Sequence, residues 1–134
     1  MNTRNIILGT VSYILASFLV QFISHFVINT AHYASISFMR AEPLMYLGLF
    51  TMLLQGIVLT FIYLKWANGN FNLKQGIVFG WLIGLFFVTY PALVEADKYS
   101  VQNIADWVAV EGSTGAVQFT IFGLLLGRFV KIKN

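Results

Sequence analysis

Four stretches of this chain are apolar and free of Asp, Glu, Lys and Arg, and each approaches the length that a bilayer requires. A helix needs about 20 apolar residues to cross a hydrocarbon core of roughly 30 Å. The last stretch is short, with 16 residues between Glu111 and Arg128, so its helix must begin upstream of Glu111. The predicted spans are residues 5–28, 43–64, 75–94 and 104–128.

Short connectors join these spans, which predicts one transmembrane domain over residues 1–134. We therefore expect an all-α fold, a four-helix bundle that runs up, down, up, down. Glu42 and Pro43 are predicted to open the second span, because proline is tolerated in the first turn of a helix. Pro91 is expected to kink or end the third span. Residues 95–110 are too polar to span and predict an amphipathic segment on the outer surface.

The first span carries a polar stripe between residues 10 and 25. At about 100° per residue, every polar side chain here except Ser12 falls within an arc of about 120°. Such a face in lipid is expected to turn toward other helices, where its groups can form hydrogen bonds. Glu111 and Gln118 point in nearly the same direction from the fourth span, and we expect this face to meet the stripe. The stripe consists of Thr10, Tyr13, Ser17, Gln21, Ser24 and His25.

Small residues recur at helical spacing on the third and fourth spans. Glycines at this spacing let two helix backbones approach closely, which replaces the hydrophobic drive that is missing between helices in lipid. We expect these faces to close the bundle first and to support assembly second. The predicted packing residues are Gly76, Gly80, Gly84, Gly123 and Gly127.

The basic residues predict the orientation of the chain. Six of them lie at the two ends and in the middle connector, whereas Arg40 and Lys98 are the two in the other connectors. Because cytoplasmic loops of membrane proteins carry the excess of Lys and Arg, both termini are expected in the cytoplasm. The predicted location is the cell inner membrane, with multiple passes. All five acids, Glu42, Glu95, Asp97, Asp106 and Glu111, then lie on the outer side.

The composition agrees with a membrane environment. Of 134 residues, 58% are hydrophobic and 10% are charged, and the mean hydropathy is +0.77. A soluble domain carries about 25% charged residues. The eight cations are scattered and form no basic face, which argues against nucleic acid as a partner. Because the chain has no cysteine, disulfide scaffolds, thiolate metal sites and dithiol redox chemistry are excluded.

One constellation of polar residues suggests a binding site. His25, Glu42 and Glu111 are predicted near the outer edge of the membrane, and Gln21, Gln55 and Gln118 lie deeper. Ionisable groups at membrane depth often mark a site, so these residues could form an outward-facing pocket for a cation or a polar ligand. A structural interpretation stays open, because amide groups also bond across helices for less than about 2 kcal/mol each.

Other chemistry has weak support in the sequence. His25 and His32 could bind a metal together, but no HxxxH or HExxH spacing accompanies them, and neither metal nor cofactor is expected. Nucleophilic catalysis would need a motif such as GxSxG, and a phosphate site would need a glycine-rich loop. Neither motif is present. We therefore expect no catalytic residues.

The pattern of motifs resembles small, uncharacterised four-span bacterial membrane proteins. The resemblance rests on Glu42-Pro43-Leu44, Gln55-Gly56, Gly80-x-x-x-Gly84, and Glu111 with Gln118-Phe119. It implies the four-span architecture and a bacterial inner membrane, and it implies no activity.

Two functions are consistent with these observations. The first is a non-catalytic interaction or assembly component, whose partners are the lipid bilayer and either another membrane protein or a second copy of the chain. The alternative is a small transporter or ligand-binding protein with an outward-facing polar pocket around His25, Glu42 and Glu111.

Overall fold

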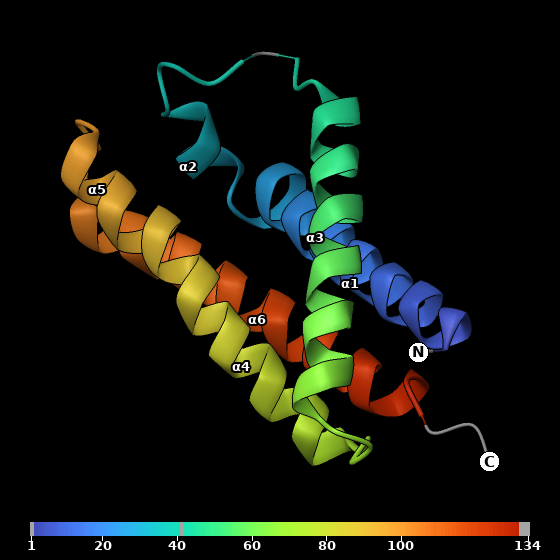
Figure 1. Ribbon diagram of the computed structural model, residues 1–134. Coiled ribbons are helices and arrows are strands. Elements are labelled where there is room, and N and C mark those ends of the chain that lie inside the picture. Colours follow the sequence, from blue (N-terminus) through green and yellow to red (C-terminus); the bar gives the residue numbers. More distant parts are fainter. Residues whose placement is uncertain (1, 41, 132–134) are drawn as a thin grey trace.

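The computed structural model describes residues 2–40 and 42–131, which are mostly helical and include no strand. Figure 1 shows the long helical segments, with the short helices α2 and α5 at one end. Two of the long segments contain a π-helical turn, a wider turn of the backbone. The elements are α1 Thr3–Ile23, η1 Ser24–Ile28, α2 Thr30–Ala34, α3 Met45–Trp66, α4 Leu73–Thr89, η2 Tyr90–Val94, α5 Glu95–Lys98 and α6 Ile104–Phe129.

Within residues 2–40 and 42–131, four helical segments are long and apolar enough to cross a membrane, which confirms the helical class and the predicted number of membrane-length helices. They are Thr3–Ile28, Met45–Trp66, Leu73–Lys98 and Ile104–Phe129. These properties fit a multi-pass membrane protein.

The start of the second span differs from the prediction. The helix begins at Met45 and not at Glu42-Pro43. Leu44 has φ −79° and ψ 79°, and the Met45 amide donates to the Pro43 carbonyl at 3.0 Å. This is the geometry of an inverse γ-turn, which is incompatible with a helix at that residue. Glu42 and Pro43 therefore lie exposed in the connector.

The structure divides residues 95–110, which were predicted as one amphipathic surface segment, between α5, a connector and the start of α6. Pro91 does not end the third helix, because the chain passes through the π-helical turn η2 and continues to Lys98. A π-helical turn accommodates the missing proline donor within an otherwise continuous helix. Residues 99–103 form the connector, and α6 begins at Ile104 as predicted, where the Asn103 side chain accepts from two backbone amides.

The glycines of α4 lie directly against the backbone of α6. A Cβ on Gly80 would collide with the Phe119 carbonyl oxygen, and one on Gly123 would lie 2.6 Å from the Gly76 carbonyl oxygen. A Cβ on Gly127 would lie 2.7 Å from the backbone of Asn72. Figure 1 shows α4 and α6 side by side over most of their length. This contact depends on the absence of side chains at these positions.

The helix α1 lies between α3 and α6 and contacts both. Thr10 packs on Gly56 of α3, and the Tyr13 ring packs edge-on against Phe122 of α6, with their centroids 5.0 Å apart. The buried cluster at this junction is dominated by aromatic and leucine side chains. Its largest members are Tyr13, Leu59, Tyr63, Phe79, Phe119, Phe122 and Leu126.

The start of α1 and the end of α6 lie at the same end of the molecule. The Asn5 side-chain amide donates to the Lys131 carbonyl at 2.9 Å. The helices α2 and α5 lie at the other end, as Figure 1 shows. We call this second end, formed by residues 24–40 and 90–110, the α2 end.

Candidate functional site

A polar seam joins α1 to α6. Gln118 donates to the Ser17 hydroxyl at 2.9 Å and accepts from the Gln21 amide at 2.7 Å. One turn nearer the α2 end, the Ser24 and Thr114 hydroxyls are 3.0 Å apart. The predicted meeting of the polar stripe with the Gln118 face is therefore confirmed.

The short helix α2 covers the α2 end of this seam. The Tyr33 hydroxyl donates to Glu111 Oε1 at 3.1 Å, and His32 Nε2 lies 3.7 Å from the same oxygen. The His25 ring stacks on the Tyr33 ring, with centroids 3.5 Å apart and planes 11° apart. The π-helical turn η1 ends where Asn29 donates to the Ser24 carbonyl, and it lets the chain turn back so that α2 can reach Glu111.

Burial keeps Tyr33 in its protonated form. Removal from water raises the pKa of the Tyr33 hydroxyl, the bond to Ser24 lowers it, and the charge and bond of Glu111 raise it further. The side chain is 7% exposed. Tyr33 is therefore a stable donor to the Glu111 carboxylate.

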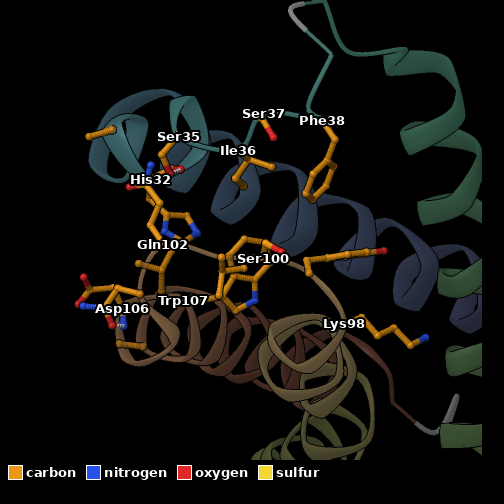
Figure 2. A pocket seen from close by; sticks show the side chains of 16 residues that line it. His32, Ser35, Ile36, Ser37, Phe38, Lys98, Ser100, Gln102, Asp106 and Trp107 are labelled. Atoms are coloured by element: carbon orange, nitrogen blue, oxygen red, sulfur yellow. Dashed lines mark hydrogen bonds between the residues drawn. The ribbon is translucent and has the colours of Figure 1, made fainter.

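A cavity of about 710 Å³ opens beside this cluster at the α2 end. Three parts of the chain form it, namely residues 31–38, residues 98–103 and the first turns of α6. Figure 2 shows its side chains converging from these segments, with His32 and Trp107 in the wall. The Trp107 indole donates to the Pro91 carbonyl at 2.8 Å, which fixes the ring against η2. Small-molecule sites usually measure about 300–1,000 Å³.

The residues predicted for a pocket do not line this cavity. Gln21 and Gln118 bond to each other, and Gln55 accepts from the Tyr13 hydroxyl at 2.7 Å between α1 and α3. Glu42 lies exposed in the connector before α3. These amides hold helices together because their polar groups have partners on neighbouring helices.

His25 and Glu111 lie behind the cavity wall. His25 bonds through Nδ1 to the Gln21 carbonyl at 2.9 Å. Glu111 does not line the cavity, but it contacts His32, which does. The residues of the predicted pocket are thus separated. The three glutamines lie in contacts between helices, Glu42 lies in a connector, and His25 and Glu111 lie behind the cavity wall.

Residues outside the predicted pocket form the cavity itself, and among these His32 alone had been considered for binding from the sequence, as a possible metal ligand. They come from the two connectors at the α2 end and from the start of α6, and the main polar and aromatic ones are His32, Phe38, Tyr99, Asp106 and Trp107. The available signal was that both connectors carry polar and aromatic residues and were expected on the same side of the membrane. Which of these residues meet depends on the path of each connector.

The structure gives no support to the idea of a metal site at the histidines. His25 stacks on the face of Tyr33, whereas His32 contacts the same ring edge-on, with centroids 5.0 Å apart. Within residues 2–40 and 42–131 no group of three His, Asp or Glu side chains is placed to hold a metal ion.

In comparisons with known proteins, no family model, no curated protein and no solved structure matched this chain. The function is therefore argued from the geometry of the cavity and of the seam behind it.

Proposed function

We propose that this chain is a multi-pass protein of the cell inner membrane that binds a small molecule at its outer end without catalysing a reaction. The four spans run up, down, up, down, with both termini in the cytoplasm and the α2 end outside. The cavity of about 710 Å³ between α2, the connector 99–103 and α6 is the observation that carries this proposal.

The distribution of charge supports the orientation. Within the described residues, the end opposite α2 holds Arg4, Lys65, Lys74, Arg128 and Lys131, whereas the α2 end holds Arg40 and Lys98. An excess of Lys and Arg in short loops marks the cytoplasmic side. The cavity then faces the outside.

The polar seam supports a binding role for the cavity. Its hydrogen bonds fix α1 and α2 against α6. The side chains of His32 and Trp107, which contact each other, are therefore already ordered in the cavity wall. A preformed wall avoids the entropy cost of ordering side chains when a ligand binds. The Glu111 oxygen that faces this wall already accepts from Tyr33, which favours a positioning role over acid–base catalysis.

A cavity-filling variant tests the proposal. The thermal stability of the detergent-purified chain is measured with a panel of organic cations, organic anions and uncharged polar compounds. At least one class should raise the unfolding temperature of the wild type and of Ala105→Trp, but not of Ala109→Trp. Ala109 lines the cavity, whereas Ala105 is exposed one turn away on the same helix and does not.

Either of two results would overturn this function. The first is a panel in which no compound stabilises the wild type. The second is a stabilisation that Ala109→Trp retains in full, which would place the compound elsewhere on the molecule.

The absence of cysteine makes the orientation directly testable. Single cysteines are introduced as Ser100→Cys at the α2 end and as Asn70→Cys in the connector between α3 and α4. A maleimide that cannot cross membranes should label the first and not the second in intact cells. The reverse pattern would place the cavity on the cytoplasmic side.

A second candidate function, assembly, is favoured by the first half of α3. Residues 45–50 are exposed, and a Cβ on Gly48 would meet no atom within 4 Å. A second copy of the chain could pack on this part of α3. Oxidative cross-linking of Gly48→Cys in native membranes should then yield a dimer, while Ile7→Cys, exposed on α1, should not. A monomer with both variants would exclude this assembly.

A further inference from the structure

We infer that the ligand of the cavity is a small organic ammonium cation, an inference that rests on the proposed binding function. Three features of the cavity point to this chemistry. They are its aromatic walls, the carboxylate in its lining, and the engagement of its one lysine elsewhere.

Two pairs of aromatic rings line the cavity. Phe38 and Tyr99 have centroids 5.0 Å apart, and His32 and Trp107 have centroids 5.3 Å apart. The faces of Trp, Tyr and Phe attract an ammonium group within about 6 Å of the ring centroid. In Figure 2, Phe38 lies in one part of the lining and His32 and Trp107 in another. Both pairs belong to the lining of the same cavity.

The cations of the protein do not occupy these rings. In the part of the chain that the structure describes, cations lie over rings in three places, Lys98 over Tyr90, Lys65 over Phe61 and Arg128 over Phe129. None of these three rings lines the cavity. The exposed rings of Phe38 and Tyr99 therefore carry no cation from the described residues.

The charges around the cavity favour a cation over an anion. Asp106 lines the cavity, and its carboxylate makes no hydrogen bond or ion pair to another described residue. Lys98 lines the margin, but its ammonium donates to the Tyr90 hydroxyl at 3.3 Å, away from Asp106 (Figure 2). The α2 end holds the carboxylates of Glu95, Asp97 and Asp106 against the cations Arg40 and Lys98, and Glu42 and Glu111 lie next to it. Such a surplus raises the local concentration of cations.

The Trp107 ring supports the wall of the cavity from behind. It is 6% exposed, its indole donates to the Pro91 carbonyl, and its face lies near His32. Because the Trp107 ring is almost fully covered, it supports His32 in the wall, and a ligand can reach the more exposed rings of Phe38 and Tyr99. A wall that is already ordered avoids the entropy cost of fixing side chains when a ligand binds. Recognition therefore depends on the positive charge and the shape of the ligand.

Two matched pairs of probes separate charge from shape. Choline is compared with 3,3-dimethylbutan-1-ol, and acetylcholine with 3,3-dimethylbutyl acetate, in which carbon replaces the charged nitrogen. Binding to the detergent-purified full chain is measured by isothermal titration calorimetry. At least one cation should bind about tenfold or more tightly than its neutral partner.

Variants locate the preference in the cavity. Asp106→Asn, which keeps the shape of the side chain, should weaken cation binding about tenfold and reduce the difference between the members of a pair. Tyr99→Leu should weaken it by a similar factor, because one ring face is lost. Tyr46→Leu, at an exposed ring on α3, is the matched control and should leave binding unchanged.

The outcomes distinguish this inference from the proposed function. Two results would overturn the inference that the ligand is a cation and leave the proposed binding function in place. They are equal affinity within both pairs of probes, and stabilisation by anions or neutral compounds alone in the panel above. An unchanged cation affinity in Asp106→Asn and Tyr99→Leu would also overturn this inference. A panel without any stabilising compound would instead remove the binding function itself.

Discussion

The two neighbours of α6 are held by different means. Against α4, the contact is made by backbone, with Gly76 and Gly80 lying on the carbonyls of Gly123 and Phe119. Against α1, the contact is made by polar side chains, with Gln118 bonded to both Ser17 and Gln21. Because the hydrophobic effect does not drive helices together in lipid, close backbone packing and hydrogen bonds are the interactions that hold these two pairs of helices.

The difference lies in what each seam tolerates. A backbone contact has no side chain that can move aside, so an added carbon must push the helices apart. A hydrogen-bonded seam can lose one bond and keep its spacing. We therefore expect the α4–α6 contact to be the more sensitive to substitution.

The largest effect is expected at the α4–α6 contact. Gly80→Leu places a side chain against the Phe119 carbonyl, and we expect a loss of about 3 kcal/mol or more, or failure to fold. Gel filtration and thermal unfolding of the purified chain measure this. Gly112→Leu, where a Cβ meets no atom within 4 Å, should behave as the wild type. Similar behaviour of both variants would contradict the close contact.

A smaller effect is expected at the α1–α6 seam. Gln118→Leu keeps the size of the side chain but leaves Ser17 and Gln21 without their partner, which should cost about 1–3 kcal/mol. The free energy of unfolding in mixed detergent measures the change. Thr51→Val is the control, because its exposed hydroxyl bonds within its own helix to Leu47. A loss as large as that of Gly80→Leu would remove the contrast between the seams.

The contribution of the Tyr33–Glu111 hydrogen bond to the free energy of unfolding should depend on pH. Tyr33→Phe removes the donor to Glu111 and should cost about 1.5 kcal/mol at neutral pH. Because the folded state raises the pKa of Tyr33, its contribution is complete below the ordinary pKa of 10.0 and is lost as the pH rises above that value. Unfolding at pH 8 and pH 11 should show a smaller alkaline loss in the variant.

Two observations would test this pH dependence. Tyr46→Phe, at an exposed ring, should leave the difference between pH 8 and pH 11 as in the wild type. An equal alkaline loss in wild type and Tyr33→Phe would mean that Tyr33 does not hold α2 on Glu111.

The smallest effect is expected on the exposed side of the α4–α6 contact. The Trp81 indole donates to the Thr120 hydroxyl at 3.0 Å, and the Trp81 side chain is 61% exposed. Trp81→Phe should cost about 0.6 kcal/mol, the usual value of one such bond between membrane helices. Thermal unfolding checks this value. A loss beyond that of Gln118→Leu would show that side-chain bonds matter at the glycine contact too.

Much of the fold could be predicted from local properties of the sequence. Length and hydropathy identified four spans, and the spacing of Gly76, Gly80 and Gly84 identified a face that meets α6. The polar stripe on α1 allowed its contact with the Gln118 face of α6 to be predicted, because few other polar groups are available in lipid to form hydrogen bonds with it. These features repeat along one helix and are therefore visible without the tertiary structure.

The boundaries near prolines could not be predicted. Pro43 was expected inside a helix and Pro91 was expected to kink or end one, but an inverse γ-turn delays α3 and a π-helical turn carries the chain past Pro91. A proline removes one donor in either case. How the chain accommodates the missing donor depends on the surrounding structure, which here also holds the turn at Pro91 through the Trp107 indole, a donor to the Pro91 carbonyl.

The sequence by itself determined that the chain has four membrane-length helices, a polar face on the first and a glycine face on the third. Hydropathy and periodicity are properties of single helices, so no folded partner is needed to see them. The tertiary structure decided that Glu111 contacts His32 behind the lining, and that residues 31–38, 98–103 and 106–110 line one open cavity. A cavity is the space left between segments far apart in the chain, and their packing alone fixes its position and its lining.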